Sequence, residues 1–264
     1  MKKSVALGCL PLLLAAEVHM AKLEPYETYR FKAAEAGQVV LADDEMEGKI
    51  AGDDAIVQID DKVDKAQLKA LKTAIESVKK TLELTKEMAE NQQKVYERDR
   101  RYYARVKNLK TKSQTEKDRV FATMAAAKNQ LLTLKEKIAS LENQIADTDY
   151  RIAMLKDRIA KKRVAAPGLY IYKVAVRRDD YVNPGTLLMT AMDIRKGRLV
   201  LYLDRDEMRD LAHKKIYIDG KPTDLRWDKV IRVADDKHIT SYRAEIVVPN
   251  PGKLFSKLLK VEIK

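Results

Sequence analysis

Two stretches, LKALKTAIESVKKTLEL (68–84) and LLTLKEKIASLENQIADTDYRIAMLKDRIA (131–160), decide the fold of this chain. Both lie in a segment from Lys62 to Arg163 that contains neither glycine nor proline. In each stretch apolar residues recur in alternating steps of three and four, which is the heptad pattern of a coiled coil. The first seam is Leu68, Leu71, Ile75, Val78, Leu82, Thr85, Ala89, Gln92, Tyr96, Asp99, Tyr103 and Val106, and the second is Val120, Met124, Ala127, Leu131, Leu134, Ile138, Leu141, Ile145, Thr148, Ile152, Leu155 and Ile159.

The two seams share one centre. Leu68 lies as far before Ser113 as Ile159 lies after it, to within one residue, and Val106 and Val120 are related in the same way. Two separate helices, or a parallel dimer, would have no reason to share a centre. The polar run 110–117 also interrupts the seam where a turn is needed. The sequence therefore predicts an antiparallel coiled-coil hairpin over 63–163 with its tip near Ser113, each arm roughly 70 Å long at the rise of an α-helix.

Short apolar stretches with turn residues between them flank the hairpin on both sides. Val39–Leu41 and Ala55–Ile59 predict strands before it, and the Ala166-Pro167-Gly168 turn opens a second strand-rich region. That region predicts strands at 169–176, 186–192, 198–203, 215–218 and 239–248, with one short helix at 206–213. The fold class is thus α+β, with two β-rich parts interrupted by the hairpin.

The first residues resemble a signal peptide, assigned here to 1–21. Lys2 and Lys3 precede an apolar run, 5–16, that is too short to span a bilayer. Cleavage after Ala16 or Ala21 would place the mature protein in the periplasm and leave it without cysteine. The alternatives are an uncleaved anchor or lipoprotein processing at Cys9.

Composition argues against several function classes. The formal net charge of +12 invites a nucleic-acid interpretation, but basic and acidic residues interleave along the helical segment, which is typical of a solvated helix surface. The chain has three histidines, and His213 and His238 are far apart. No nucleophile, dinucleotide or phosphate-loop motif is evident. We therefore expect a non-catalytic protein without cofactor or metal.

The order of these parts resembles the membrane fusion proteins, the haemolysin-D-like periplasmic adaptors of tripartite efflux pumps and type I secretion systems. In that family the hairpin splits a lipoyl-like (barrel-sandwich hybrid) domain, and a β-barrel domain follows. Here 36–40, 47–48 and 56–60 resemble the first half, 164–168 and 179–188 the second, and 199–203 with Glu207 the start of the barrel. The resemblance implies a first half at 22–62, a second half at 164–193 and a barrel at 194–264.

The same resemblance implies partners and a docking site. The family links an inner-membrane transporter, driven by ATP or protons, to a TolC-like outer-membrane duct, and assembles as a ring, here of six copies. Its hairpin tip docks through an Arg, a Leu and a Ser. The run from Ser113 to Asp118 resembles the stretch beginning at that Ser; Arg101 and Val106 fall near the Arg and Leu positions, while Arg105 and Leu109 keep the Arg-to-Leu spacing. The alternative function is a periplasmic metal- or stress-binding coiled-coil protein without a pump partner.

Overall fold

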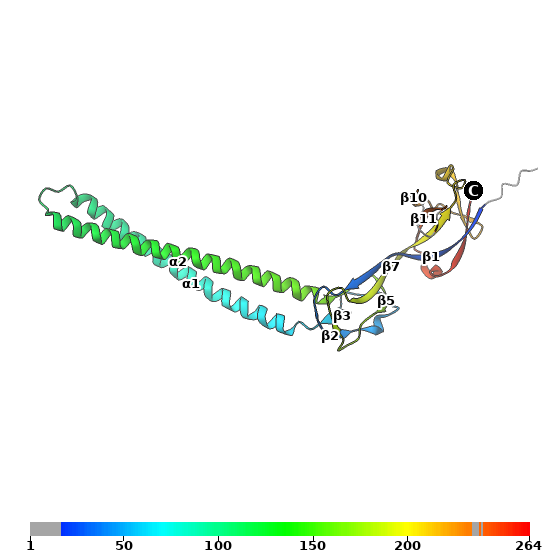
Figure 1. The fold of residues 1–264 in the computed structure, drawn as a ribbon, viewed down its shortest axis with the longest axis horizontal. Helices are drawn as coiled ribbons and strands as arrows, with labels where there is room; N and C mark the ends of the chain where they lie inside the picture. Colours follow the sequence, from blue (N-terminus) through cyan, green and yellow to red (C-terminus); the bar gives the residue numbers. More distant parts are fainter. Residues whose placement is uncertain (1–16, 234–237, 239) are drawn as a thin grey trace, which may run out of the picture.

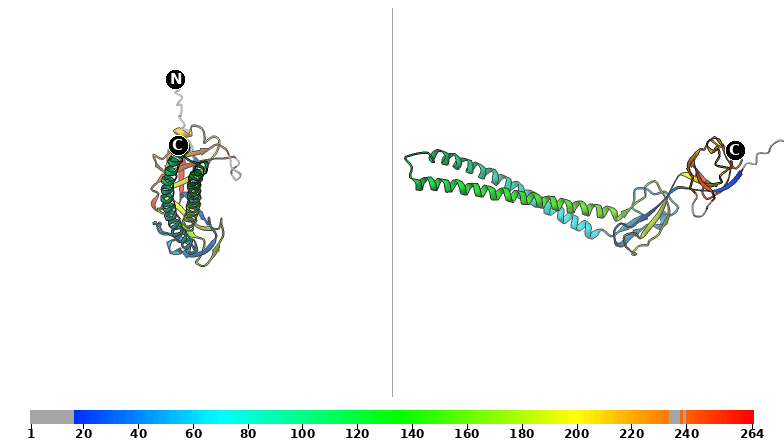
Figure 2. Two further views of the ribbon diagram at one scale, coloured as in Figure 1. Left: turned by 90° about the vertical axis from the view of Figure 1, so that its left-hand side faces the viewer. Right: turned by 45° about the horizontal axis from the view of Figure 1, so that its top comes forward.

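The computed structural model describes residues 17–233, 238 and 240–264. The molecule is elongated, with a long helical hairpin at one end and two β-rich bodies in line at the other (Figure 1). Two further views show the same arrangement, with the helices side by side (Figure 2). The expected signal segment up to residue 16, including Cys9, lies outside the described residues.

The predicted antiparallel hairpin is confirmed. Helix α1 spans Lys62–Val106 and α2 spans Gln114–Lys161, and they pack along their length (Figure 1). Because the heptad pattern keeps one stripe of each helix toward its partner, the hydrophobic residues that are buried all belong to the two predicted seams. They are Ile75, Ala89 and Val106 in α1 and Val120, Ala127, Leu131, Leu141, Ile152 and Leu155 in α2.

One side chain crosses the hairpin at a slant, toward the tip. The side chain of Gln92 donates to the Ala127 carbonyl at 3.0 Å and to Gln130 at 3.1 Å, whereas the predicted centre would place it opposite Leu134. These contacts lie one to two helical turns closer to the tip, which a long glutamine side chain can reach. The ion pair of Lys86 with Glu142 at 2.8 Å agrees with the predicted centre to within two residues. The turn also begins after Val106 and ends at Ser113, so Ser113 starts α2 and is not the centre of the loop.

The smaller β body contains residues from both sides of the hairpin, as expected for a split lipoyl-like domain. Its sheet has the order β4-β3-β2-β6, with β2 at Gly37–Ala42, β3 at Val57–Ile59, β4 at Arg163–Val164 and β6 at Tyr181–Val182. Strand β5 (Tyr170–Val174) and a 3-10 turn (η1, Asp44–Met46) pack beside it. The core includes Val39, Val57, Ile59, Ile171, Val174, Val182, Leu188 and Met189.

The second β body is a curled half-barrel. Its strand order is β10-β11-β7-β1-β12-β8-β9, and β5 also pairs with β7. The strands are β1 (Glu17–Lys32), β7 (Leu187–Leu203), β8 (Ile216–Ile218), β9 (Lys221–Pro222), β10 (Trp227–Ile231), β11 (Tyr242–Pro249) and β12 (Leu258–Ile263), with 3-10 turns at Leu211–His213 (η2) and Gly252–Leu254 (η3). Leu23, Leu199, Leu201, Leu203, Ile216, Ile246 and Val261 fill its core. The helix predicted at 206–213 is a turn followed by η2.

Two long strands pass through both β bodies. Strand β1 pairs with β12 from Glu17 to Lys22 and with β7 from Leu23 to Lys32. The strands predicted at 186–192 and 198–203 are one continuous strand, β7. It crosses position 194, where the sequence predicts the boundary between the lipoyl-like domain and the barrel. Gly197 permits this close pairing, because a Cβ there would lie 2.8 Å from a Leu23 methyl carbon.

Candidate functional site at the hairpin tip

The tip consists of the end of α1, the loop 107–113 and the start of α2. The loop begins with hydrogen bonds from the Lys107 amide to the Tyr103 carbonyl and from the Leu109 amide to the Val106 carbonyl. Ser113 ends it as the N-cap of α2, since its Oγ accepts from the Glu116 amide at 3.2 Å. These backbone contacts give the loop a defined shape.

Lys112 and Glu116 close the loop side by side. The Lys112 ammonium lies 2.6 Å from the Glu116 carboxylate. Because this carboxylate accepts a hydrogen bond from the Lys112 ammonium, the pKa of Lys112 is raised above its ordinary value. Serine followed three residues later by glutamate is the sequence of a capping box. Here the glutamate side chain pairs with Lys112.

Five of the six residues predicted for docking are exposed. Arg101, Arg105, Leu109, Ser113 and Asp118 all present surface at the tip. Val106, the sixth docking residue that the resemblance implies, is buried, with only 3% of it accessible, so it does not present apolar surface to a partner. The seam extends to the last residue of α1, so the Val106 side chain packs within the hairpin.

Two exposed aromatic residues that the sequence did not single out lie beside these positions. Tyr102 is 45% exposed and Phe121 is 50% exposed, comparable to Leu109 at 44%. The Arg105 guanidinium lies 6.0 Å from the Tyr102 ring centre, and Phe121 packs against Tyr103 with ring centres 5.4 Å apart. Tyr102 directly precedes the seam residue Tyr103, and Phe121 directly follows the seam residue Val120. Aromatic residues next to seam positions at the end of the hairpin are the sequence signal that could have identified both. The tip therefore combines apolar surface with arginine.

Positive charge is concentrated at the tip. Residues 98–119 contain nine Lys and Arg but three Asp and Glu, an excess of six that is half of the net charge of +12. Two of the acidic residues pair locally, Asp99 with Arg98 at 2.9 Å and Glu116 with Lys112. The described residues supply no ion pair to the other seven cations, which are Arg100, Arg101, Arg105, Lys107, Lys110, Lys117 and Arg119. The tip is thus suited to a partner surface rich in carboxylates.

A buried ion pair at the other end anchors the hairpin to the smaller β body. Lys162 Nζ lies 2.5 Å from Asp64 Oδ2 and also donates to the Asp60 carbonyl at 2.8 Å. Arg158 approaches the other oxygen of Asp64 at 3.6 Å. We call Asp60, Asp64, Arg158 and Lys162 the base clasp. Because it joins both arms to the segment that precedes α1, the base clasp fixes the base of the hairpin to the smaller β body.

Within the described ranges, no helix has a segment both long and apolar enough to cross a lipid bilayer. The same residues contain no group of three or more His, Cys, Asp and Glu side chains placed to bind a metal ion.

Comparison with known proteins identifies the fold. No family model and no curated protein sequence matches the chain. Among solved structures, MacA from Actinobacillus actinomycetemcomitans is similar over 94% of this chain and 78% of its own, with a TM-score of 0.72 and 16% identity. A MacA-MexA chimera carrying the Pseudomonas aeruginosa MexA α-hairpin covers 94% and 81%, at TM-score 0.63 and 13% identity. The membrane fusion protein Spr0693 from Streptococcus pneumoniae R6 covers 94% and 97%, at 0.63 and 8%.

These similarities extend through the hairpin and both β bodies. The chain has the fold of the membrane fusion proteins: a helical hairpin, a small lipoyl-like sheet and a curled half-barrel. The predicted resemblance and fold class are confirmed. At identities of 8 to 16%, the similarity establishes the fold, and the role of this chain has to be argued from its own residues.

Proposed function

We propose that this chain is a non-catalytic periplasmic adaptor that links an inner-membrane transporter to an outer-membrane exit duct for efflux or secretion. One observation supports it above the others. A hairpin with arms of 45 and 48 residues projects away from both β bodies and ends in an exposed, apolar and positively charged tip. At 1.5 Å per residue the arms reach roughly 70 Å.

The hairpin suits a connecting role because it is stiff and anchored. Its seam is continuous from the base to Val106, and the base clasp joins both arms to the smaller β body. Globular helices average about a dozen residues, so arms of this length are not needed to bury a core. Their use is to place the tip far from the β bodies.

The tip is the proposed docking surface for the duct. Arg101, Arg105, Leu109, Ser113 and Asp118 form it, together with the exposed rings of Tyr102 and Phe121, whereas Val106 supports it from inside. Arginine and aromatic side chains are the residues that most often dominate protein interfaces. The positive excess at the tip requires a duct surface with exposed carboxylates.

The β bodies form the opposite end of the adaptor. The half-barrel contains the C-terminus and the first described residues, paired as β1 and β12 (Figure 1). In the proposed assembly this end contacts the inner-membrane transporter, six copies form a ring, and the signal segment directs export to the periplasm.

Site-specific photo-crosslinking tests the docking role. A benzoylphenylalanine at Leu109 should crosslink in intact cells to an outer-membrane channel protein identified by mass spectrometry. The same probe at Leu84, which is 62% exposed on α1 but nearer the base, should not. A channel adduct from both positions, or from neither, would contradict docking through the tip.

Charge reversal provides a second readout. Arg101→Glu with Arg105→Glu should abolish export, with helicity and melting temperature unchanged because both side chains are exposed. The matched control, Lys69→Glu with Lys72→Glu, makes the same change in charge on exposed positions of α1 near the base and should export normally. Equal loss in both variants would mean that overall charge, and not the tip, is responsible.

A further inference from the structure

A cavity lies where the two β bodies meet. It has a volume of about 590 Å³ and is lined by residues of β1, β5 and β7 and of the loop that contains η3. We call it the joint pocket; its lining residues are Lys22, Leu23, Glu24, Pro25, Thr28, Tyr170, Tyr172, Met192, Ile194, Arg198, Gly252, Phe255 and Ser256. This volume is within the range of small-molecule sites in proteins.

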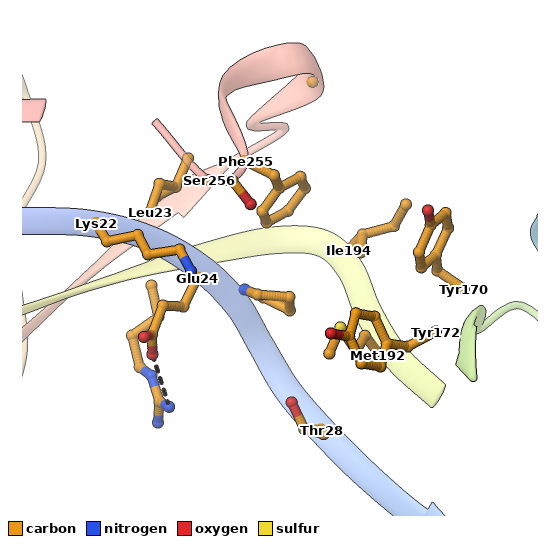
Figure 3. Close-up of a pocket in the computed structure, with 13 residues that line it drawn as sticks. Lys22, Leu23, Glu24, Thr28, Tyr170, Tyr172, Met192, Ile194, Phe255 and Ser256 are labelled. Carbon is orange, nitrogen blue, oxygen red and sulfur yellow. Dashed lines mark ion pairs between the residues drawn. The ribbon is translucent and has the colours of Figure 1, made fainter. Parts of the chain in front are cut away.

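Apolar and aromatic side chains from both bodies line one part of the joint pocket. Tyr170, Tyr172 and Ile194 lie on one side of the cavity, and Phe255 lies toward the half-barrel (Figure 3). Tyr172 is 59% exposed, so much of its ring is uncovered. Such surface gains free energy when an apolar or aromatic group covers it.

The polar part of the joint pocket has an excess of positive charge. Lys22 and Glu24 lie together at the opposite side from the tyrosines (Figure 3). Lys22 has no ion pair with any of the described residues, and Arg198 adds a second cation. Glu24 is the one carboxylate among the lining residues, and it approaches Arg198 at 3.9 Å.

Arg198 has hydrogen-bonding capacity that the protein leaves unused. Its guanidinium lies 3.7 Å from Glu245, a carboxylate that is 1% exposed and that also accepts hydrogen bonds from Arg243. The Nε–H of Arg198 is shielded from solvent and has no hydrogen-bond partner among the described residues. Because this atom is shielded, an incoming anion would meet the two outer nitrogens of the guanidinium, whose nearest carboxylates lie only at 3.9 and 3.7 Å, and could accept charge-assisted hydrogen bonds from them.

We propose that the joint pocket binds a small amphipathic anion, with its aromatic or aliphatic part against Tyr170, Tyr172 and Phe255 and its anionic group toward Lys22 and Arg198. The proposal goes beyond the adaptor function and does not depend on tip docking. Since the walls belong to both β bodies, the bound molecule would also hold the two bodies at one angle.

A matched pair of fluorescent probes tests the proposal on the purified chain. The anionic probe is 8-anilinonaphthalene-1-sulfonate, and N-phenyl-1-naphthylamine has the same rings without the sulfonate. We expect saturable 1:1 binding of the sulfonate, about fivefold tighter than that of the neutral probe, which is the size expected of a partly exposed charge contact.

Three variants locate the binding. Lys22→Gln should weaken the sulfonate about fivefold and leave the neutral probe unchanged, whereas Tyr172→Ala should weaken both. Lys32→Gln, an exposed lysine on β1 outside the pocket, is the control and should alter neither. Circular dichroism checks that each variant is folded.

Three outcomes would overturn the proposal. These are equal affinity for the two probes, binding that neither Lys22→Gln nor Tyr172→Ala affects, and loss of binding on self-association. The last would show that a second copy of the chain covers the cavity. None of them bears on crosslinking at Leu109, so the adaptor function is tested separately.

Discussion

The base clasp provides the most direct energetic test of how the hairpin is anchored. The side chains of Lys162 and Asp64 are only 12% and 10% exposed, and their charged atoms lie 2.5 Å apart. Asp64→Ala would leave the Lys162 ammonium buried with one remaining acceptor, the Asp60 carbonyl at 2.8 Å. Removing one partner of a buried ion pair costs 3–5 kcal/mol in general, and the remaining carbonyl places this case at the lower end, about 3 kcal/mol.

The reverse change should cost less. Lys162→Met leaves Asp64 beside Arg158, which lies 3.6 Å from it and can take over part of the pairing. We expect about half the cost of Asp64→Ala. Replacing both residues together, Asp64→Leu with Lys162→Met, removes both buried charges and should be close to neutral, so that the two single changes are strongly non-additive.

Urea unfolding followed by circular dichroism at 222 nm measures this cycle. Asp157→Ala is the matched control, because Asp157 pairs with Lys161 on the same helix at 2.6 Å but both side chains are about half exposed. That change should alter the free energy of unfolding little. If Asp64→Ala is as mild as Asp157→Ala, the argument that the clasp is a buried, stabilising pair is wrong.

Three further predictions concern other parts of the chain. Ser113→Ala should cost about 1 kcal/mol at the start of α2 by removing the hydrogen bond to the Glu116 amide, seen as faster hydrogen exchange there, whereas Ser113→Asp should preserve the cap. Hydrogen bonds from Lys260 and Lys264 hold the pKa of Glu262 at about 2, below its ordinary 4.5, so its stabilising contribution is complete above pH 4.5 and is lost as the pH falls toward 2. Glu262→Gln should remove this part of the acid dependence of unfolding, and an unchanged acid limb would count against it. Mass spectrometry of the periplasmic protein should find a mature chain that starts at Glu17, since cleavage after Ala21 would remove the strand residues that pair with β12 and the contact between His19 and Glu207; a start at Lys22 would disprove this.

The hairpin could be predicted from sequence because its determinants are local. Heptad spacing depends on neighbours three and four residues away, and the common centre of the two seams adds the one long-range fact that is needed. The error at the tip has a physical reason. Symmetry of the seams fixed the centre at Ser113, but Ser113 is the N-cap of α2 and must stand at the end of the turn. The seam itself ends as predicted at Val106, the last residue of α1, which is buried.

Strand β1 shows what the sequence could not reveal. Its partners, β7 and β12, lie more than 150 residues away in the chain, and a register shift between Pro25 and Glu27 interrupts the alternation of inward and outward residues. The first residues of β1 directly follow the apolar signal-like run. For this reason the sequence places the end of the signal peptide at Ala21 and the start of the lipoyl-like half at Lys22. The joint pocket is hidden for the same reason, because it combines residues from four separate segments.

The path between the half-barrel and the tip runs through β1 and β7. The base clasp fixes the hairpin to the smaller β body, so these two parts form one lever. Between that lever and the half-barrel, the two strands pair with a register shift at Pro25–Glu27, opposite the segment where Asp193 binds Arg195. A two-stranded ribbon twists more readily than a wide sheet. With arms of roughly 70 Å, a rotation of about 10° at this ribbon displaces the tip by roughly 12 Å. In an adaptor the angle at the joint would therefore determine whether the tip reaches its partner, and the joint pocket lies at the position where a bound molecule can set that angle.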